Sequence, residues 1–168
     1  GSNGDHAIAR LNDGSIVSVW SALQTVDNDV FRVRYLASGE RAGPQSLLSV
    51  VVQLNQISPD VAALGNGNYV GTWATPDGSG NGVTGQIFLA DGTRLGGEFQ
   101  INNTAIVQSE SQPTVESLAS GGFVVSFNRP GEANTYGRIY DVNGVALGAE
   151  FRLNATPGIV ALSTTLAP

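Results

Sequence analysis

The chain has 168 residues, about 41% of them hydrophobic, and a formal net charge of −6. This length corresponds to one domain or one repeat array, and the hydrophobic content is sufficient for a packed core. The negative charge argues against nucleic acid as a partner, because phosphates require clustered Lys and Arg. No hydrophobic stretch approaches the roughly 18 residues of a membrane-spanning helix, so the sequence predicts no membrane insertion.

Three residue types are missing from the sequence. Without Cys there are no disulfides, thiolate nucleophiles or thiolate metal ligands. Without Lys, all eight cationic side chains are Arg. Since Met is missing as well, we expect the chain to be part of a longer or processed protein.

A unit of about 53 residues occurs three times in the sequence. Its clearest part is a hairpin of two apolar runs flanking a glycine turn, at residues 7–20, 60–73 and 114–127. The aromatic residue that closes this hairpin is Trp20, Trp73 or Phe127, at spacings of 53 and 54 residues. A second turn glycine, at positions 39, 92 and 144, recurs at spacings of 53 and 52.

Each copy predicts four short antiparallel strands, which we name A to D. Strands A and B meet at Asp13-Gly14, Asn66-Gly67 or Ser120-Gly121. Such dipeptides favour the left-handed backbone conformation of two-residue hairpins. The alternation of polarity along strand B places Trp20, Trp73 and Phe127 on its apolar face, where we expect them in the core.

Strands C and D complete each copy. Strand C contains Tyr35, Phe88 or Tyr140 and runs into the second glycine turn. Strand D is Gly97–Asn102 in the second copy and Ala149–Asn154 in the third, and it shortens to residues 44–48 in the first. No segment has a sustained period of 3.6 residues, so we expect essentially no helix.

The predicted fold class is all-β, with three four-stranded antiparallel repeats arranged as β-propeller-like blades. The alternative is a β-trefoil, which has three four-stranded lobes. Consecutive hairpins with aromatic residues on strand B favour the propeller. The repeats are residues 1–51 (divergent), 52–104 and 105–156, and 157–168 form a tail or the start of a further repeat. Three blades make only an arc, so we expect further blades or self-association that closes the array.

The third copy resembles a repeat of bacterial RTX-type secreted proteins, which runs roughly P-x-V-A-x-L, D-G-G-F-V-V-x-W, G-Q-R-F-D-A-D-G and G-x-E-F-x-V-N. The matching segments are Gln112–Val115, Gly121–Phe127, Tyr136–Gly144 and Gly148–Asn154, and in the second copy Ser58–Leu64, Gly85–Gly92 and Gly97–Asn102. The resemblance implies large calcium-binding adhesins, exported by type I secretion from Gram-negative bacteria to the cell surface. It implies no catalytic residues.

The loops between strands B and C hold the candidate metal ligands. Asp27 and Asp29 offer two carboxylates at i and i+2, and Asp77 lies in a Gly/Ser/Asn loop. Calcium prefers six to eight oxygen ligands from flexible polar loops, so calcium is the cofactor that these residues fit. The alternative is that Asp and Asn serve turn geometry alone. One His and no Cys argue against zinc.

The third B–C loop holds the candidate ligand-binding residues. Glu132 and Asn134 lie next to Tyr136, which combines an aromatic ring with polar groups. Catalysis is not expected. A glycosidase needs two carboxyl groups in unlike environments, whereas Glu98 and Glu150 occupy matched repeat positions.

We therefore expect a non-enzymatic extracellular module for adhesion, which binds a surface polysaccharide or a cell-surface protein through its B–C loops. The alternative is a structural role, as a self-assembling surface-layer or filament subunit or as a spacer. Selective glycan binding would support the first hypothesis, and concentration-dependent assembly without it would support the second.

Overall fold

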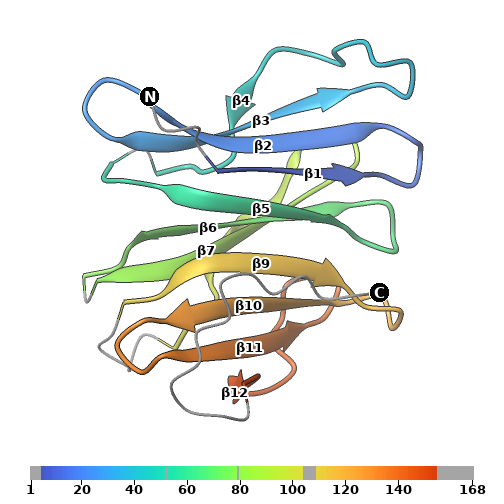
Figure 1. Ribbon diagram of the computed structural model, residues 1–168. Coiled ribbons are helices and arrows are strands. Elements are labelled where there is room, and N and C mark those ends of the chain that lie inside the picture. Colours follow the sequence, from blue (N-terminus) through green and yellow to red (C-terminus); the bar gives the residue numbers. More distant parts are fainter. Residues whose placement is uncertain (1–4, 52, 79, 104–108, 155–168) are drawn as a thin grey trace.

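The computed structural model describes residues 5–51, 53–78, 80–103 and 109–154. This part of the chain contains no helix and forms three four-stranded antiparallel sheets (Figure 1). Within each sheet the strands are paired in chain order. The strands are β1 (His6–Arg10), β2 (Ile16–Leu23), β3 (Asn28–Tyr35), β4 (Ser46–Leu47), β5 (Ile57–Ala63), β6 (Tyr69–Pro76), β7 (Asn81–Phe88), β8 (Arg94–Gln100), β9 (Ser111–Ser117), β10 (Phe123–Arg129), β11 (Asn134–Tyr140) and β12 (Phe151–Arg152).

The sheets lie one above another in Figure 1, and we number them sheet 1 (β1–β4), sheet 2 (β5–β8) and sheet 3 (β9–β12). Strand β5 packs against β1 and β2, and β9 packs against β5 and β6. The sheets are not closed into a barrel, so the trefoil is not adopted. The predicted all-β fold of three four-stranded repeats is confirmed, and the arrangement is propeller-like. Residues 157–168, assigned to a tail or further repeat, lie outside the described residues.

The hairpin register repeats from sheet to sheet. Trp20 pairs with Phe31, Trp73 with Thr84, and Phe127 with Tyr136. All six turn glycines predicted from the sequence have φ between 83° and 96°, the region that a side chain disfavours. The glycine turns therefore set the pairing of strands, and the period of two decides which residues face the neighbouring sheet.

Two apolar clusters hold the sheets together. At interface 1–2, between sheets 1 and 2, Trp73 is 1% exposed and packs with Val17, Val19, Tyr69 and other buried residues. Interface 2–3 is formed by a cluster that includes Phe123, Phe127, Ile87 and Tyr140. Full burial of an aromatic side chain of this kind contributes several kcal/mol, so these clusters are the main source of the stacking.

Trp20 differs from its counterparts. It lies on the face of β2 that points away from sheet 2, stacks on Phe31 with ring centroids 5.7 Å apart, and is only half-buried. On the same face Ile8 is 68% exposed. The sequence placed Trp20 on the correct face, but its placement in the core is wrong, because no preceding sheet covers that face in the described chain.

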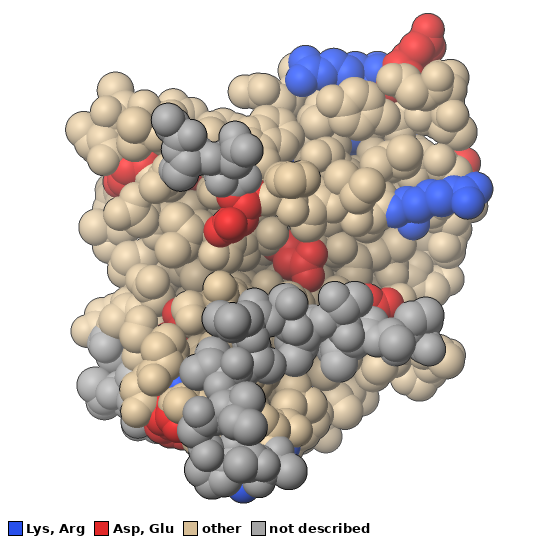
Figure 2. Space-filling view, in the orientation of Figure 1, with Lys and Arg blue, Asp and Glu red and all other residues tan. Residues whose placement is uncertain are grey.

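Charged side chains are spread over the surface. In Figure 2, isolated arginine side chains project from the upper part of the molecule, and acidic side chains are scattered over the rest of this face. Within the described residues, no helix meets the length and hydropathy needed to cross a membrane. Arg34 and Asp13 form an exposed ion pair at 2.7 Å, whereas Arg129 lies buried between two glutamates.

Candidate functional site

Two glutamates at equivalent repeat positions tie each sheet to the one before it. The backbone N–H of Val50 donates to Glu98, and the backbone N–H of Asn103 donates to Glu150. Both donors follow the last strand of the preceding sheet. The two carboxylates therefore share a structural role, although Glu150 also binds Arg129.

A buried ion cluster fills interface 2–3 at the end where the β6–β7 and β10–β11 loops lie. Arg129 Nε lies 2.7 Å from Glu110 Oε1, and its Nη2 lies 2.6 Å from Glu150 Oε2. The side chains are 1%, 0% and 8% exposed, respectively. Burial raises the pKa of Glu110, and the Arg129 guanidinium offsets part of that rise. Asn102 Nδ2 donates to the second oxygen of Glu110 at 2.9 Å.

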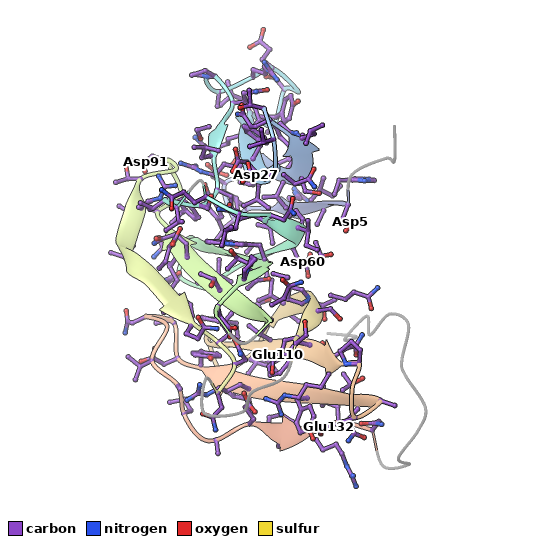
Figure 3. The ribbon with its side chains drawn as sticks, turned by 90° about the vertical axis from the view of Figure 1, so that its left-hand side faces the viewer. Asp5, Asp27, Asp60, Asp91, Glu110 and Glu132 are labelled. Carbon is purple, nitrogen blue, oxygen red and sulfur yellow. The ribbon has the colours of Figure 1, made fainter. Side chains whose placement is uncertain are left out.

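This cluster was not predicted from the sequence. One signal was available, because Arg129 is the single charged residue of its strand and stands at the position that is Thr75 in sheet 2. Figure 3 places Glu110 at the level between sheets 2 and 3, on the end of the molecule that carries Asp27 and Glu132.

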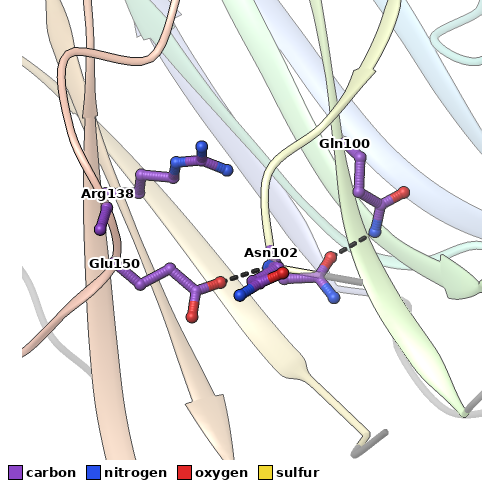
Figure 4. Close-up of a pocket in the computed structure, with 6 residues that line it drawn as sticks. Gln100, Asn102, Arg138 and Glu150 are labelled. Atoms are coloured by element: carbon purple, nitrogen blue, oxygen red, sulfur yellow. Dashed lines mark hydrogen bonds between the residues drawn. The ribbon is translucent and has the colours of Figure 1, made fainter. Parts of the chain in front are cut away.

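A cleft of about 370 Å³ opens beside the ion cluster (Figure 4). Its walls come from the end of β8 and from the β11 and β12 region of sheet 3: Gln100, Asn102, Asn103, Arg138, Ala149 and Glu150. Arg138 donates through Nε to the carbonyl of Gly148 at 3.2 Å and through Nη1 to that of Ile101 at 2.9 Å. These bonds use two of its five N–H groups, so a guanidinium with spare donors stands in the wall.

The equivalent place at interface 1–2 is built differently. The same repeat positions hold Leu47, Ser49, Val50, Gln86, Gly97 and Glu98. Here Gln86 is buried and its amide donates to backbone carbonyls, the nearest being that of Ile87 at 2.8 Å. Arg94 also enters this interface and donates to the carbonyls of Leu47, Leu48 and Ser49. The lining by Gln100, Asn103 and Arg138 is therefore particular to interface 2–3 and is not a requirement of the repeat.

The residues predicted to bind a ligand lie close together. The Tyr136 hydroxyl donates to Glu132 Oε2, and Asn134 Nδ2 donates to the same oxygen at 3.3 Å. Arg129 stacks 4.2 Å above the Tyr136 ring. These three residues meet next to the ion cluster but do not line the cleft, so Arg138, Gln100 and Asn103 are the better candidates for ligand contact.

The residues predicted to bind metal do not all lie in loops, because Asp29 is the second residue of strand β3 and not part of the loop before it. Asp27 and Asp29 belong to sheet 1 and Asp77 to the β6–β7 loop, and within the described residues no three His, Asp or Glu side chains gather. Asp29 is 4% exposed, and burial, followed by the charge of Asp27, raises its pKa. Asp77 Oδ2 lies 2.6 Å from where a Cβ at Gly82 would stand, beside Asn102. Calcium binding by these residues stays a prediction.

Comparisons with known proteins identify the fold and no family. No family model matches the chain and no curated sequence is significantly similar, so the RTX resemblance stays a prediction. A fucose lectin from Kordia zhangzhouensis, solved with methyl-fucoside, superimposes with a TM-score of 0.54 at 9% identity, over 90% of this chain and 99% of the lectin.

Two further similar structures are longer proteins. An endo-arabinase from Bacteroides thetaiotaomicron has a TM-score of 0.52 at 13% identity and is matched over 82% of this chain. A putative glycoside hydrolase from Bacteroides ovatus has a TM-score of 0.53 at 12% identity and is matched over 84% of this chain. The chain spans 55% and 47% of their lengths, about half of each. At these identities the likenesses show a shared propeller-like fold.

Proposed function

We propose that the protein is a non-enzymatic, extracellular binding module that recognises carbohydrate in the cleft of interface 2–3. The observation that carries this proposal is the contrast between the two interfaces. Their scaffold is repeated, yet only the second replaces Leu47, Val50 and Gln86 by Gln100, Asn103 and Arg138 around an open cleft. Arg138 in particular keeps N–H groups that the two printed hydrogen bonds do not use.

The chemistry of the cleft suits a sugar. Sugar hydroxyl groups both donate and accept hydrogen bonds, and the wall offers guanidinium and amide donors beside amide oxygens. The volume of about 370 Å³ falls in the lower part of the ~300–1,000 Å³ range of small-molecule sites. Support also comes from the fucose lectin, which shares the fold along nearly its entire chain.

The two carboxylates of the ion cluster beside the cleft support binding without hydrolysis. Glu110 and Glu150 both bind Arg129, and Glu150 also accepts a backbone N–H, so these two acids are engaged in holding the sheets together. A glycosidase instead places two carboxyl groups on opposite sides of the scissile bond. We propose the extracellular location because the RTX resemblance implies it.

A glycan array that includes methyl-fucoside and arabinose oligosaccharides tests the proposal. We expect selective binding by the wild type and at least tenfold weaker binding by Arg138→Met. The matched control is Arg10→Met, because Arg10 is an exposed arginine of β1, outside the cleft. Absence of binding to every glycan, or equal binding by Arg138→Met, would refute the assignment, and release of reducing sugar would refute the non-enzymatic role.

One observation favours a second function, self-assembly through sheet 1. On the face of sheet 1 that carries Trp20, Ile8 is 68% exposed and Trp20 is half-buried, whereas the same face of sheets 2 and 3 is covered by the preceding sheet. We propose a second copy of this chain as its partner. Light scattering over a concentration series should then show association that Trp20→Glu abolishes, and a monomer at all concentrations would exclude this function.

A further inference from the structure

We infer a docking pocket for a lysine side chain of a partner protein, at the end of interface 2–3 opposite the ion cluster. Asp141 binds the ammonium group, and Val142 and Leu147 contact the methylene stem. The pocket is separate from the proposed sugar cleft, and it does not depend on carbohydrate binding.

A cavity of about 330 Å³ lies among the turns at this end of the interface. One wall comes from the turn between β5 and β6, and the others come from the β9–β10 turn and the β11–β12 connection of sheet 3. Leu147 is 66% exposed, so its apolar surface is open to a partner. The lining residues are Asn66, Ser120, Gly121, Gly122, Asp141, Val142 and Leu147, and none of them lines the sugar cleft.

Asp141 presents one carboxylate oxygen to this cavity. The N–H groups of Asn143 and Val145 donate to its Oδ1 at 2.9 Å and 2.8 Å. These bonds, that of Val145 most strongly, lower the pKa of Asp141, so the carboxylate is charged at neutral pH. Among the described residues, neither hydrogen bond to this carboxylate uses Oδ2, and no arginine forms an ion pair with it. The negative charge is therefore available to a cation from outside.

An ammonium group on an apolar stem matches this lining. It has three N–H donors and no acceptor, and the wall offers Asp141 Oδ2, the Ser120 hydroxyl and the Asn66 amide oxygen. An arginine fork pairs best with two carboxylate oxygens, and the turn already uses one. An amino sugar would direct hydroxyl groups at Val142 and Leu147, whereas the lysine stem buries its methylene groups on apolar surface. None of the 168 residues is Lys, so no copy of them supplies the occupant.

The equivalent end of interface 1–2 differs at two positions. Leu89 stands where sheet 3 has Asp141, so the carboxylate is absent. Asn12 stands where sheet 2 has Gly65, and its amide donates across the interface to the Gly65 carbonyl at 3.2 Å. Gly65 makes no such bridge to sheet 3, and a Cβ there would meet only Gly121, at 3.8 Å. The repeat therefore does not require the carboxylate or the gap between the turns.

Titration of the isotope-labelled protein with Nα-acetyl-lysine amide, followed by backbone amide shifts, tests the pocket. We expect saturable shifts at Gly121, Gly122 and Val142. Asp141→Asn keeps an acceptor for the turn and should bind about fivefold more weakly, as expected for the loss of an exposed charge pair. The matched control is Asp91→Asn, because Asp91 accepts the Thr93 N–H at 2.7 Å in the corresponding turn of sheet 2 but does not line the pocket.

A second variant covers the case in which Asp141→Asn does not fold. Leu147→Ser changes an exposed side chain and should weaken lysine binding by several fold without affecting folding. Nα-acetyl-norleucine amide has the stem without the ammonium and should bind much more weakly than the lysine compound. The inference is overturned if the lysine compound causes no saturable shifts, if Asp141→Asn or the norleucine compound binds as well as its counterpart, or if glucosamine binds there more tightly than lysine.

Discussion

Replacing Arg129 by Met tests the role of the buried ion cluster most sharply. The side chain of Arg129 is 1% exposed and that of Glu110 is 0% exposed, so the substitution leaves a buried carboxylate without its cation. Breaking a buried ion pair by removing one partner costs about 3–5 kcal/mol. For a chain of this length that corresponds to a fall in melting temperature of about 6–20 °C. Urea unfolding followed by tryptophan fluorescence measures the loss.

The loss should depend on pH in a particular direction. Burial already raises the pKa of Glu110, and Arg129→Met removes the group that offsets this rise. A carboxyl group whose pKa is higher in the folded state contributes stability at low pH and loses that contribution as the pH rises through the folded pKa. The deficit of Arg129→Met should therefore be larger at pH 8 than at pH 5.

A second substitution at Glu110 completes the test. The double variant Arg129→Met with Glu110→Gln removes the more deeply buried of the two orphaned charges, and interface 1–2 likewise holds Gln56 at this position. Glu150 still lacks its cation, so the double variant should recover part of the lost stability and weaken the pH dependence. Arg34→Met is the matched control, because it breaks an exposed ion pair and should change stability little. The reasoning is wrong if Arg129→Met stays within about 1 kcal/mol of the wild type, or if the double variant is no more stable than the single one.

Three further predictions concern packing and pH. Gly122→Ala should unfold the protein or destabilise it severely, because its Cβ would lie 2.1 Å from a backbone carbonyl oxygen of β11, whereas Gly97→Ala meets no atom within 4 Å and should be neutral by thermal melting. Trp73→Ala should cost about 3–5 kcal/mol in urea unfolding and Trp20→Ala clearly less, and equal losses would contradict the different burial of the two rings. Burial raises the pKa of Asp60, so its contribution to stability falls as the pH rises above about 4, and Asp60→Asn should flatten the dependence of the urea midpoint on pH in that range.

The local features of the fold could be predicted from the sequence. Turn glycines such as Gly67 and Gly121 adopt the left-handed conformation that their dipeptides favour, and alternation along strand B placed Trp73 and Phe127 in the core. These properties depend on residues close in sequence. The exposure of Trp20 depends on whether another sheet covers its face. The pattern of polar and apolar residues along the strand does not reveal whether such a sheet is present.

The ion cluster and the cleft depend on contacts between residues that are far apart in the sequence. Arg129 and Glu110 are 19 residues apart and meet at an end of interface 2–3, so neither strand pattern reveals the pair. A comparison of the repeat copies does indicate the ion pair. Arg129 and Glu110 are both present at interface 2–3, and both are absent at interface 1–2, where Thr75 and Gln56 occupy the same positions. The cleft walls come from separate strands around Arg138, which only the stacking of sheets 2 and 3 brings together.

We propose that a sugar binds in the cleft of interface 2–3. Its most direct test is backbone and side-chain amide chemical-shift mapping of the isotope-labelled protein, titrated with the tightest-binding sugar of the glycan panel. We expect the largest shifts at the N–H groups of Asn103, Gln100 and Arg138. Shifts confined to the open face of sheet 1, or no shifts with any sugar of the panel, would contradict it.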